Sequence, residues 1–174
     1  MMDEGFRQPF CLDLNRPTDL PDRCPDAFHD AANRWFCRCQ ETGGVPSRKE
    51  LDPLQFFRFS PSLYLAQIEG DGDVYLRFAG DHYRQLYGRE ITGMRLSDLL
   101  PDRSQANPLR RDIDRVKGTG RPVYREDVMT WRPVPAPVHY DRLMLPLTQH
   151  RDAAEVSLLL GIAFFRHRDG TPWP

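Results

Sequence analysis

Strand-like segments occur in two groups separated by a helical block, and their order constrains the fold more than any other feature of the chain. The first group is a pair, at residues 62–69 and 74–79, joined by the turn sequence GDGD. The second group has three members, at residues 122–131, 138–148 and 155–165, with connections short enough for antiparallel neighbours. Strand runs separated by helices are typical of α+β folds. We therefore expect an α+β fold around a five-stranded antiparallel sheet.

The helical block is interrupted by glycines, which end helices readily and let the chain reverse. These glycines are Gly80, Gly88 and Gly93. We expect a short helix at residues 81–86 and a longer one at residues 109–117, where Asn107 and Pro108 suit an N-cap and a first helical position. The helices should cross one face of the sheet and enclose a small apolar volume.

A strongly amphipathic segment precedes the first strand. Apolar residues recur at spacings of three and four between Pro25 and Gly43, which predicts one helix with a single apolar stripe. An exposed aromatic stripe of this size favours aggregation, so we expect it to form a dimer or partner surface. The residues of this predicted interface are Phe28, Ala32, Trp35 and Phe36. The alternative is that the stripe covers the open face of the sheet.

The same patterns divide the chain into four parts. Residues 1–21 contain three prolines and little periodicity, so we expect a flexible or loosely docked arm. The amphipathic helix belongs to residues 22–44, the α+β domain to residues 45–166, and a short tail to residues 167–174.

Charge and hydropathy narrow the range of partners. The chain has 24 basic and 25 acidic residues, which gives no electrostatic signature of nucleic-acid binding. Its longest strongly apolar stretch, residues 158–165, is far shorter than the roughly 20 residues that cross a membrane. The first residues lack the apolar core of a secretory signal. We expect a cytoplasmic protein with no nucleic-acid or membrane partner.

All four cysteines lie before residue 40, and in the cytosol we expect them to be free thiols. Cys37 and Cys39 would point about 200° apart on a helix, and no Cys-x-x-Cys pair is present. We therefore expect no metal site.

Two sequences around the helical block resemble the signature of PAS domains. In FAGDHYRQLYGREITGMRLSDLL, a strand end and a small helix precede a glycine, as in that signature. VKGTGRPVYRE is similar to the PAS junction between the long helix and the third strand. The resemblance implies a PAS-like fold, with short helices and one longer helix across one face of the sheet.

Within that superfamily, residues 45–166 resemble the short single-PAS-domain proteins of alphaproteobacteria. The elements that carry this resemblance are Pro46–Pro53, Arg77–Gly80, Gly88–Gly93, Thr119–Tyr124, Tyr140–Leu147 and Val156–Phe165. The chain departs from them in FFRFSP before the first strand and in WRPVPAP between the third and fourth strands.

PAS domains that hold a ligand hold it between the helices and the sheet. Strand alternation indicates which side chains meet there. The residues that we expect to bind a ligand are Leu76, Phe78, Tyr83, Leu86, Tyr87, Val116, Leu143, Leu145, Leu160 and Ile162. Plain core packing explains the same set. Arg142 alternates with the leucines, so we expect it to face away from them and to pair with Glu126 or Asp127.

No cofactor follows from these residues. His82 comes before the longer helix on which some PAS relatives carry a haem ligand, so we do not expect haem. Flavin–cysteine photochemistry is excluded because no cysteine follows Cys39.

We expect a stand-alone PAS-type sensory or regulatory module in signal transduction, a homodimer without catalytic output. It would bind a small apolar or amphipathic ligand, a signalling partner protein, or both. One alternative is a ligand-free interaction adaptor with a filled core. The other is a small cone-shaped α+β isomerase or dehydratase, which needs an acid–base residue inside its cavity.

Overall fold

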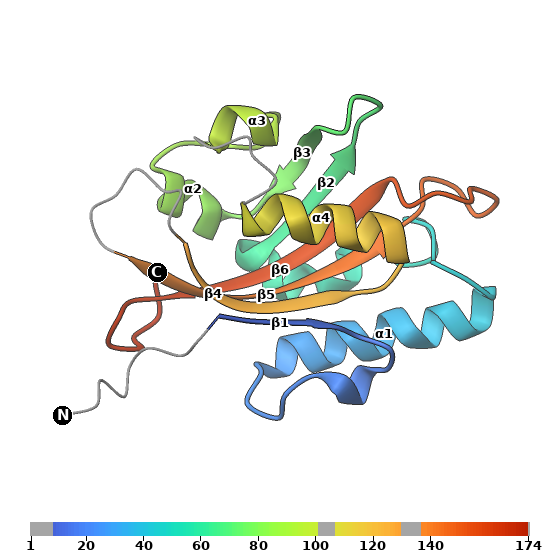
Figure 1. The fold of residues 1–174 in the computed structure, drawn as a ribbon, viewed down its shortest axis with the longest axis horizontal. Helices are drawn as coiled ribbons and strands as arrows, with labels where there is room; N and C mark the ends of the chain where they lie inside the picture. Colours follow the sequence, from blue (N-terminus) through green and yellow to red (C-terminus); the bar gives the residue numbers. More distant parts are fainter. Residues whose placement is uncertain (1–8, 101–106, 130–136, 174) are drawn as a thin grey trace.

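A six-stranded antiparallel sheet runs through the middle of the molecule in the computed structural model, which describes residues 9–100, 107–129 and 137–173 (Figure 1). Its strand order is β1-β4-β5-β6-β2-β3. The strands are β1 (Phe10–Asp13), β2 (Leu63–Ile68), β3 (Val74–Ala79), β4 (Val123–Met129), β5 (Val138–Leu147) and β6 (Leu158–Arg166). The α+β class and the five expected strands are confirmed. Most of WRPVPAP, at residues 131–136, lies outside the described residues.

The sixth strand, β1, lies in the part of the chain that was expected to be a flexible arm. It pairs with β4 from Phe10 opposite Glu126 to Asp13 opposite Val123. The next residue, Leu14, is fully buried, and its backbone N–H donates to the carbonyl of Pro122 at 2.9 Å. The expectation of a flexible arm is therefore wrong for residues 10–20. Four paired residues between prolines give too short an alternation to stand out in the sequence.

Helices cover both faces of the sheet. They are η1 (Pro17–Asp19), α1 (Asp26–Thr42), η2 (Pro53–Ser62), α2 (Asp81–Tyr87), α3 (Leu96–Leu99) and α4 (Pro108–Thr119). In Figure 1, α2, α3 and α4 lie on one face and α1 lies on the other. Helix α4 passes Gly118, where the sequence predicted its end, and stops at Gly120 in the left-handed conformation.

The apolar stripe of α1 packs against the sheet. Phe28 and Ala32 are fully buried, and the indole Nε1 of Trp35 donates a hydrogen bond to the carbonyl of Pro146 at 2.8 Å. Phe36 is partly buried and contacts the Trp35 ring edge-on, with 4.9 Å between ring centroids. The predicted interface is thus wrong for Phe28, Ala32 and Trp35, because their side chains form the core between α1 and the sheet.

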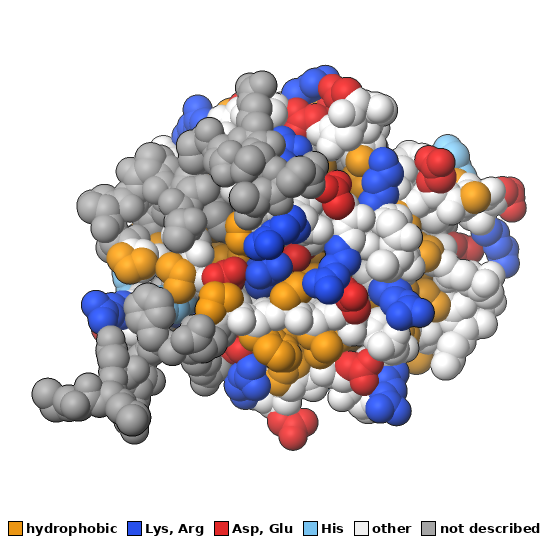
Figure 2. Space-filling view, viewed as in Figure 1, with side chains coloured by type: hydrophobic (Ala, Val, Ile, Leu, Met, Phe, Trp, Pro, Cys, Tyr) orange, Lys and Arg blue, Asp and Glu red, His pale blue; other side chains and the backbone are white. Residues whose placement is uncertain are grey.

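The surface over α4 carries both signs of charge. Figure 2 shows basic and acidic side chains interspersed there instead of gathered in a basic stripe. None of the helices in the described part of the chain is long and apolar enough to cross a membrane.

Candidate ligand cavity

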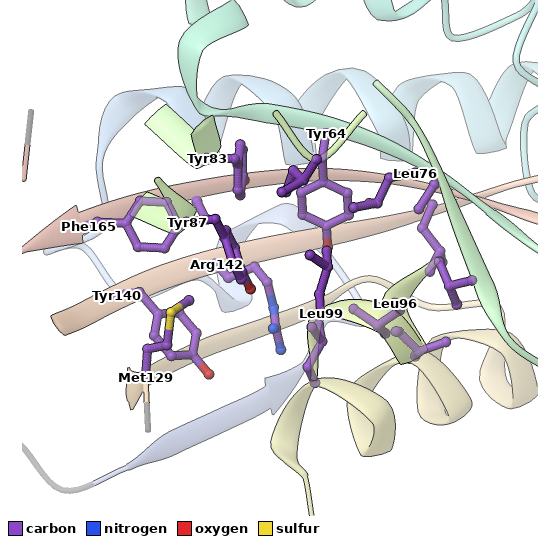
Figure 3. Close-up of a pocket in the computed structure, with 17 residues that line it drawn as sticks. Tyr64, Leu76, Tyr83, Tyr87, Leu96, Leu99, Met129, Tyr140, Arg142 and Phe165 are labelled. Atoms are coloured by element: carbon purple, nitrogen blue, oxygen red, sulfur yellow. The ribbon is translucent and has the colours of Figure 1, made fainter. Parts of the chain in front are cut away.

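A small cavity lies between the sheet and helices α2, α3 and α4 (Figure 3). Its volume is about 70 Å³, and its lining is almost entirely apolar or aromatic. Strands β2 and β5 contribute Tyr64, Tyr140 and Arg142, and α2 contributes Tyr83 and Tyr87. The cavity is where the glycine-punctuated block folds back over the sheet, as the sequence predicted.

Only three of the ten predicted ligand-binding residues line this cavity, namely Leu76, Tyr83 and Tyr87. Leu86 and Val116 lie in the same core without reaching the cavity wall. The remaining five belong to the opposite face of the sheet.

Four of those five were assigned to the cavity because the prediction chose the wrong face of β5 and β6. Leu143, Leu145, Leu160 and Ile162 are fully buried against α1, in the second core of the molecule. The leucine-rich face needs the large amphipathic helix as its cover, and the tyrosines and Arg142 therefore face the short helices. The alternation of Tyr140 and Arg142 with Leu143 and Leu145 along β5 was the signal for this second possibility.

The fifth residue, Phe78, is displaced by a β-bulge. Leu65 pairs with Phe78, but the next residue, Ala66, pairs with Leu76, so Arg77 is an extra residue in β3. One extra residue reverses the side-chain alternation of a strand. Phe78 therefore lies on the α1 side, where its side chain is 42% exposed.

Arg142 belongs to a buried ionic cluster. Its Nη2 donates to Oδ2 of Asp112 on α4. The guanidinium of Arg125 donates to the same carboxylate from Nε at 2.6 Å and from Nη2 at 2.7 Å. The predicted pairing of Arg142 with Glu126 or Asp127 is wrong, because β5 places Arg142 directly opposite Arg125 and both side chains face α4.

The cluster fixes the charge state of its carboxylate. Burial alone would raise the pKa of Asp112, but its bonds to Arg125 and the charge of Arg142 hold the pKa below the usual range. Burial raises the pKa of Tyr64 to about 12, so its hydroxyl is a neutral hydrogen-bond donor. The cavity wall therefore combines the guanidinium of Arg142, which is paired with Asp112, with the protonated hydroxyl of Tyr64.

The Tyr64 hydroxyl is buried and has no hydrogen-bond partner among the residues that the structure describes. The neighbouring Tyr83 hydroxyl, by contrast, donates to the carbonyl of Ser62 at 2.9 Å. A buried polar group without a partner is rare in folded proteins, and a missing ligand or water is a common reason.

The PAS domain pattern matches residues 26–163 of the chain, which is more than half of its length. The chain belongs to the PAS domain family. The matched PAS region begins with the first residue of α1 and so includes that helix. No curated protein matches the chain.

Among solved structures, the PAS fold here is similar to the "Structure of an RNA-binding Light-Oxygen-Voltage Receptor", with a TM-score of 0.50 and 14% sequence identity. The match covers 94% of this chain and 41% of the receptor chain. At that identity the likeness shows the PAS fold and nothing about binding. Membership of the PAS family supports a sensory or regulatory module.

The PAS cavity is too small, as it stands, for a haem or a flavin ring system. Its titratable side chains are Arg142 and four tyrosines, and the described lining contains no Asp, Glu or His. His82 lies outside the lining, with its Nδ1 3.1 Å from Oγ of Ser62. Across the described ranges, no group of three His, Cys, Asp or Glu side chains is arranged to hold a metal ion.

Proposed function

We propose that this PAS domain is a sensory or regulatory module of signal transduction that binds a small apolar or amphipathic ligand in the cavity, without catalytic output. The observation that carries the proposal is the cavity itself. Protein interiors are close-packed, and an unfilled void of about 70 Å³ costs roughly 2 kcal/mol. A ligand that fills the void recovers that energy, so binding and stability are coupled.

The ionic cluster connects the cavity to helix α4 and to the edge strand β1. Arg142, in the wall, is bonded to Asp112 on α4, and Sγ of Cys11 on β1 lies 3.6 Å from Oδ1 of the same carboxylate. A ligand that engages the other donors of Arg142 shares this guanidinium with Asp112. The seating of α4 and of the edge strand β1 then depends on whether the cavity is filled.

A thermal-shift screen with small metabolites tests the proposal, with Ala163→Leu as the matched control. Ala163 lines the cavity and is buried, so three added carbon atoms occupy the space without touching the surface. A ligand at 100 times its Kd stabilises the native state by about 2.7 kcal/mol, which raises Tm by about 5–10 °C in a domain of this size. We expect such a shift for the wild type and none for the filled variant.

Ala66→Leu, which fills the cavity from β2, serves as a second control if Ala163→Leu strains β6. A screen in which every compound acts equally on the wild type and both filled variants would overturn the proposal and favour the ligand-free adaptor.

A second candidate function, docking of a partner protein, is favoured by a separate surface. Leu54, Phe57 and Phe78 are 72%, 70% and 42% exposed and line a groove of about 330 Å³ beside η2. Apolar side chains gathered in this way mark interaction surfaces. The substitution Phe57→Ser is expected to abolish any self-association or partner binding while leaving the cavity unchanged, as measured by light scattering after size exclusion. An unchanged assembly state and partner affinity would remove this candidate.

A further inference from the structure

We propose that the ligand of the cavity is a small monocarboxylate, whose carboxylate is bound by the guanidinium of Arg142 and the hydroxyl of Tyr64. Its short apolar tail lies among the side chains of α2, α3 and α4. This inference rests on the proposed ligand-binding function and names the chemical class of the ligand.

Arg142 lies in the cavity wall and has donors that Asp112 does not use. A guanidinium carries five N–H donors, and in the described part of the chain only Nη2 of Arg142 makes a hydrogen bond, to Asp112. The side chain is 5% exposed and lines the cavity. Guanidinium groups make charge-assisted hydrogen bonds to carboxylates, and either of these donors can make one.

Tyr64 supplies a second donor toward the same space. Its buried hydroxyl has no partner among the described residues, and Figure 3 shows its ring pointing into the cavity between the strands and α3. Arg142 is near enough to oppose the effect of burial on the pKa of Tyr64. An acceptor between the two groups would satisfy both.

The way the charges are paired favours an anion over a neutral acceptor at Arg142. Two guanidiniums, those of Arg125 and Arg142, share the single fully buried carboxylate of Asp112. The second carboxylate of the cluster, that of Asp127, forms its ion pair with Arg125, at 3.1 Å, and accepts from the backbone N–H of Val128. Arg142 therefore has no carboxylate of its own in the described structure, and a ligand carboxylate would provide one.

The volume limits the size and the affinity of the ligand. A cavity of about 150 Å³ holds benzene, so about 70 Å³ suits an acid of two to four carbon atoms. Propionate has about five non-hydrogen atoms, and the ceiling on binding energy per atom keeps its Kd no tighter than about 3 μM. The site would thus respond to micromolar to millimolar concentrations.

Isoleucine-methyl NMR provides a direct test, because the chain has only four isoleucines. Ile91 and Ile113 line the cavity, whereas Ile162 lies on the opposite face of the sheet and serves as an internal control. We expect acetate, propionate or butyrate at pH 7 and constant ionic strength to shift the Ile91 and Ile113 methyl signals saturably. The Ile162 signal should stay fixed, and propionamide should bind at least tenfold more weakly than propionate.

Two substitutions test which side chains bind the carboxylate of the ligand. Tyr64→Phe removes only an unpaired hydroxyl, so the fold is retained, and we expect propionate to bind about tenfold more weakly. Arg142→Gln should abolish binding. Tyr124→Phe is the matched control, because it removes a buried hydroxyl on the opposite face and should leave the Kd unchanged.

The outcomes separate the two proposals. If propionamide or propanol shifts Ile91 and Ile113 as strongly as propionate does, the cavity binds ligands and the carboxylate assignment is wrong. The assignment is equally wrong if Tyr64→Phe binds propionate as tightly as the wild type. If no carboxylate, amide or alcohol moves the Ile91 or Ile113 signal, both this inference and ligand binding in the cavity fail.

Discussion

The aromatic ring of Tyr64 lies directly over Gly161, its paired residue on the neighbouring strand β6. A Cβ atom at position 161 would be 1.9 Å from Cζ of the tyrosine. The absence of a side chain at Gly161 therefore lets the ring lie against the sheet. This contact places the hydroxyl of Tyr64 in the wall of the cavity.

The substitution Gly161→Ala should displace the Tyr64 ring, because two atoms cannot occupy the same space. We expect a loss of about 1–3 kcal/mol in the free energy of unfolding, measured by urea denaturation. Combining it with Tyr64→Ala removes the clash, so the double variant should be more stable than the sum of the two single effects predicts. Strict additivity would show that the two residues are not in contact.

The bond between Asp112 and its two arginines should make stability depend on pH in the acid range. The pKa of Asp112 is below its usual range, so the contribution to stability is fully present above the unfolded-state pKa of about 3.9. It is lost as the pH falls through the lower pKa of the folded state. At pH 7, Asp112→Asn should reduce the free energy of unfolding by about 3–5 kcal/mol.

The same comparison, repeated at decreasing pH, checks the direction in which the contribution of Asp112 to stability changes with pH. The difference in stability between wild type and Asp112→Asn should shrink below about pH 4. A constant difference down to pH 2, or no difference at pH 7, would mean that the carboxylate does not stabilise the fold as an anion.

Substitutions of Trp35 should lower the stability of the fold and leave the oligomeric state unchanged. Trp35→Phe removes the hydrogen bond to the Pro146 carbonyl and should cost about 1–2 kcal/mol, and Trp35→Ala should cost about 3–5 kcal/mol. Cys37→Ala, at an exposed position of the same helix, is the control and should change stability by less than about 0.5 kcal/mol. A Trp35 variant that changed the oligomeric state without lowering the free energy of unfolding in urea would contradict this account. It would support the original prediction that Trp35 lies in a self-association surface.

Leu14 distinguishes a docked N-terminal strand from a loose arm. Its side chain is fully buried in the core on the α1 side of the sheet, so Leu14→Ala should lower the free energy of unfolding by about 2–5 kcal/mol. A residue in a flexible arm would change it by less than about 0.5 kcal/mol. Urea denaturation of this one variant decides between the two.

The order of strands and helices could be predicted from the sequence because each element carries a local signal. Val74–Ala79 is rich in apolar residues and follows a hairpin turn. Helix α4 begins at an Asn-Pro pair whose Asn107 side chain accepts a hydrogen bond from the backbone N–H of Leu109. Such signals depend on neighbouring residues alone. They fixed the fold class and the place of the cavity.

The lining of the cavity could not be predicted in the same way. Alternation separates Leu143 from Arg142, but it does not say which face of β5 meets which helix, since that depends on how α1 packs. The bulge at Arg77 and the pairing of Arg125 with Arg142 depend on strand register, which no local pattern sets. The alphaproteobacterial resemblance, homodimerisation and location in the cytoplasm remain predictions.

The most direct test of the central claim, that the cavity of this PAS domain holds a small ligand, is native mass spectrometry. The wild type and Ala163→Leu would each be exchanged into ammonium bicarbonate and measured in the presence of the low-molecular-weight fraction of a cell extract, so that a weakly bound ligand is not removed. We predict one discrete added mass on the wild type that is absent from the filled variant. Identical masses without any addition on both proteins would contradict the claim and leave the cavity as an imperfection of packing.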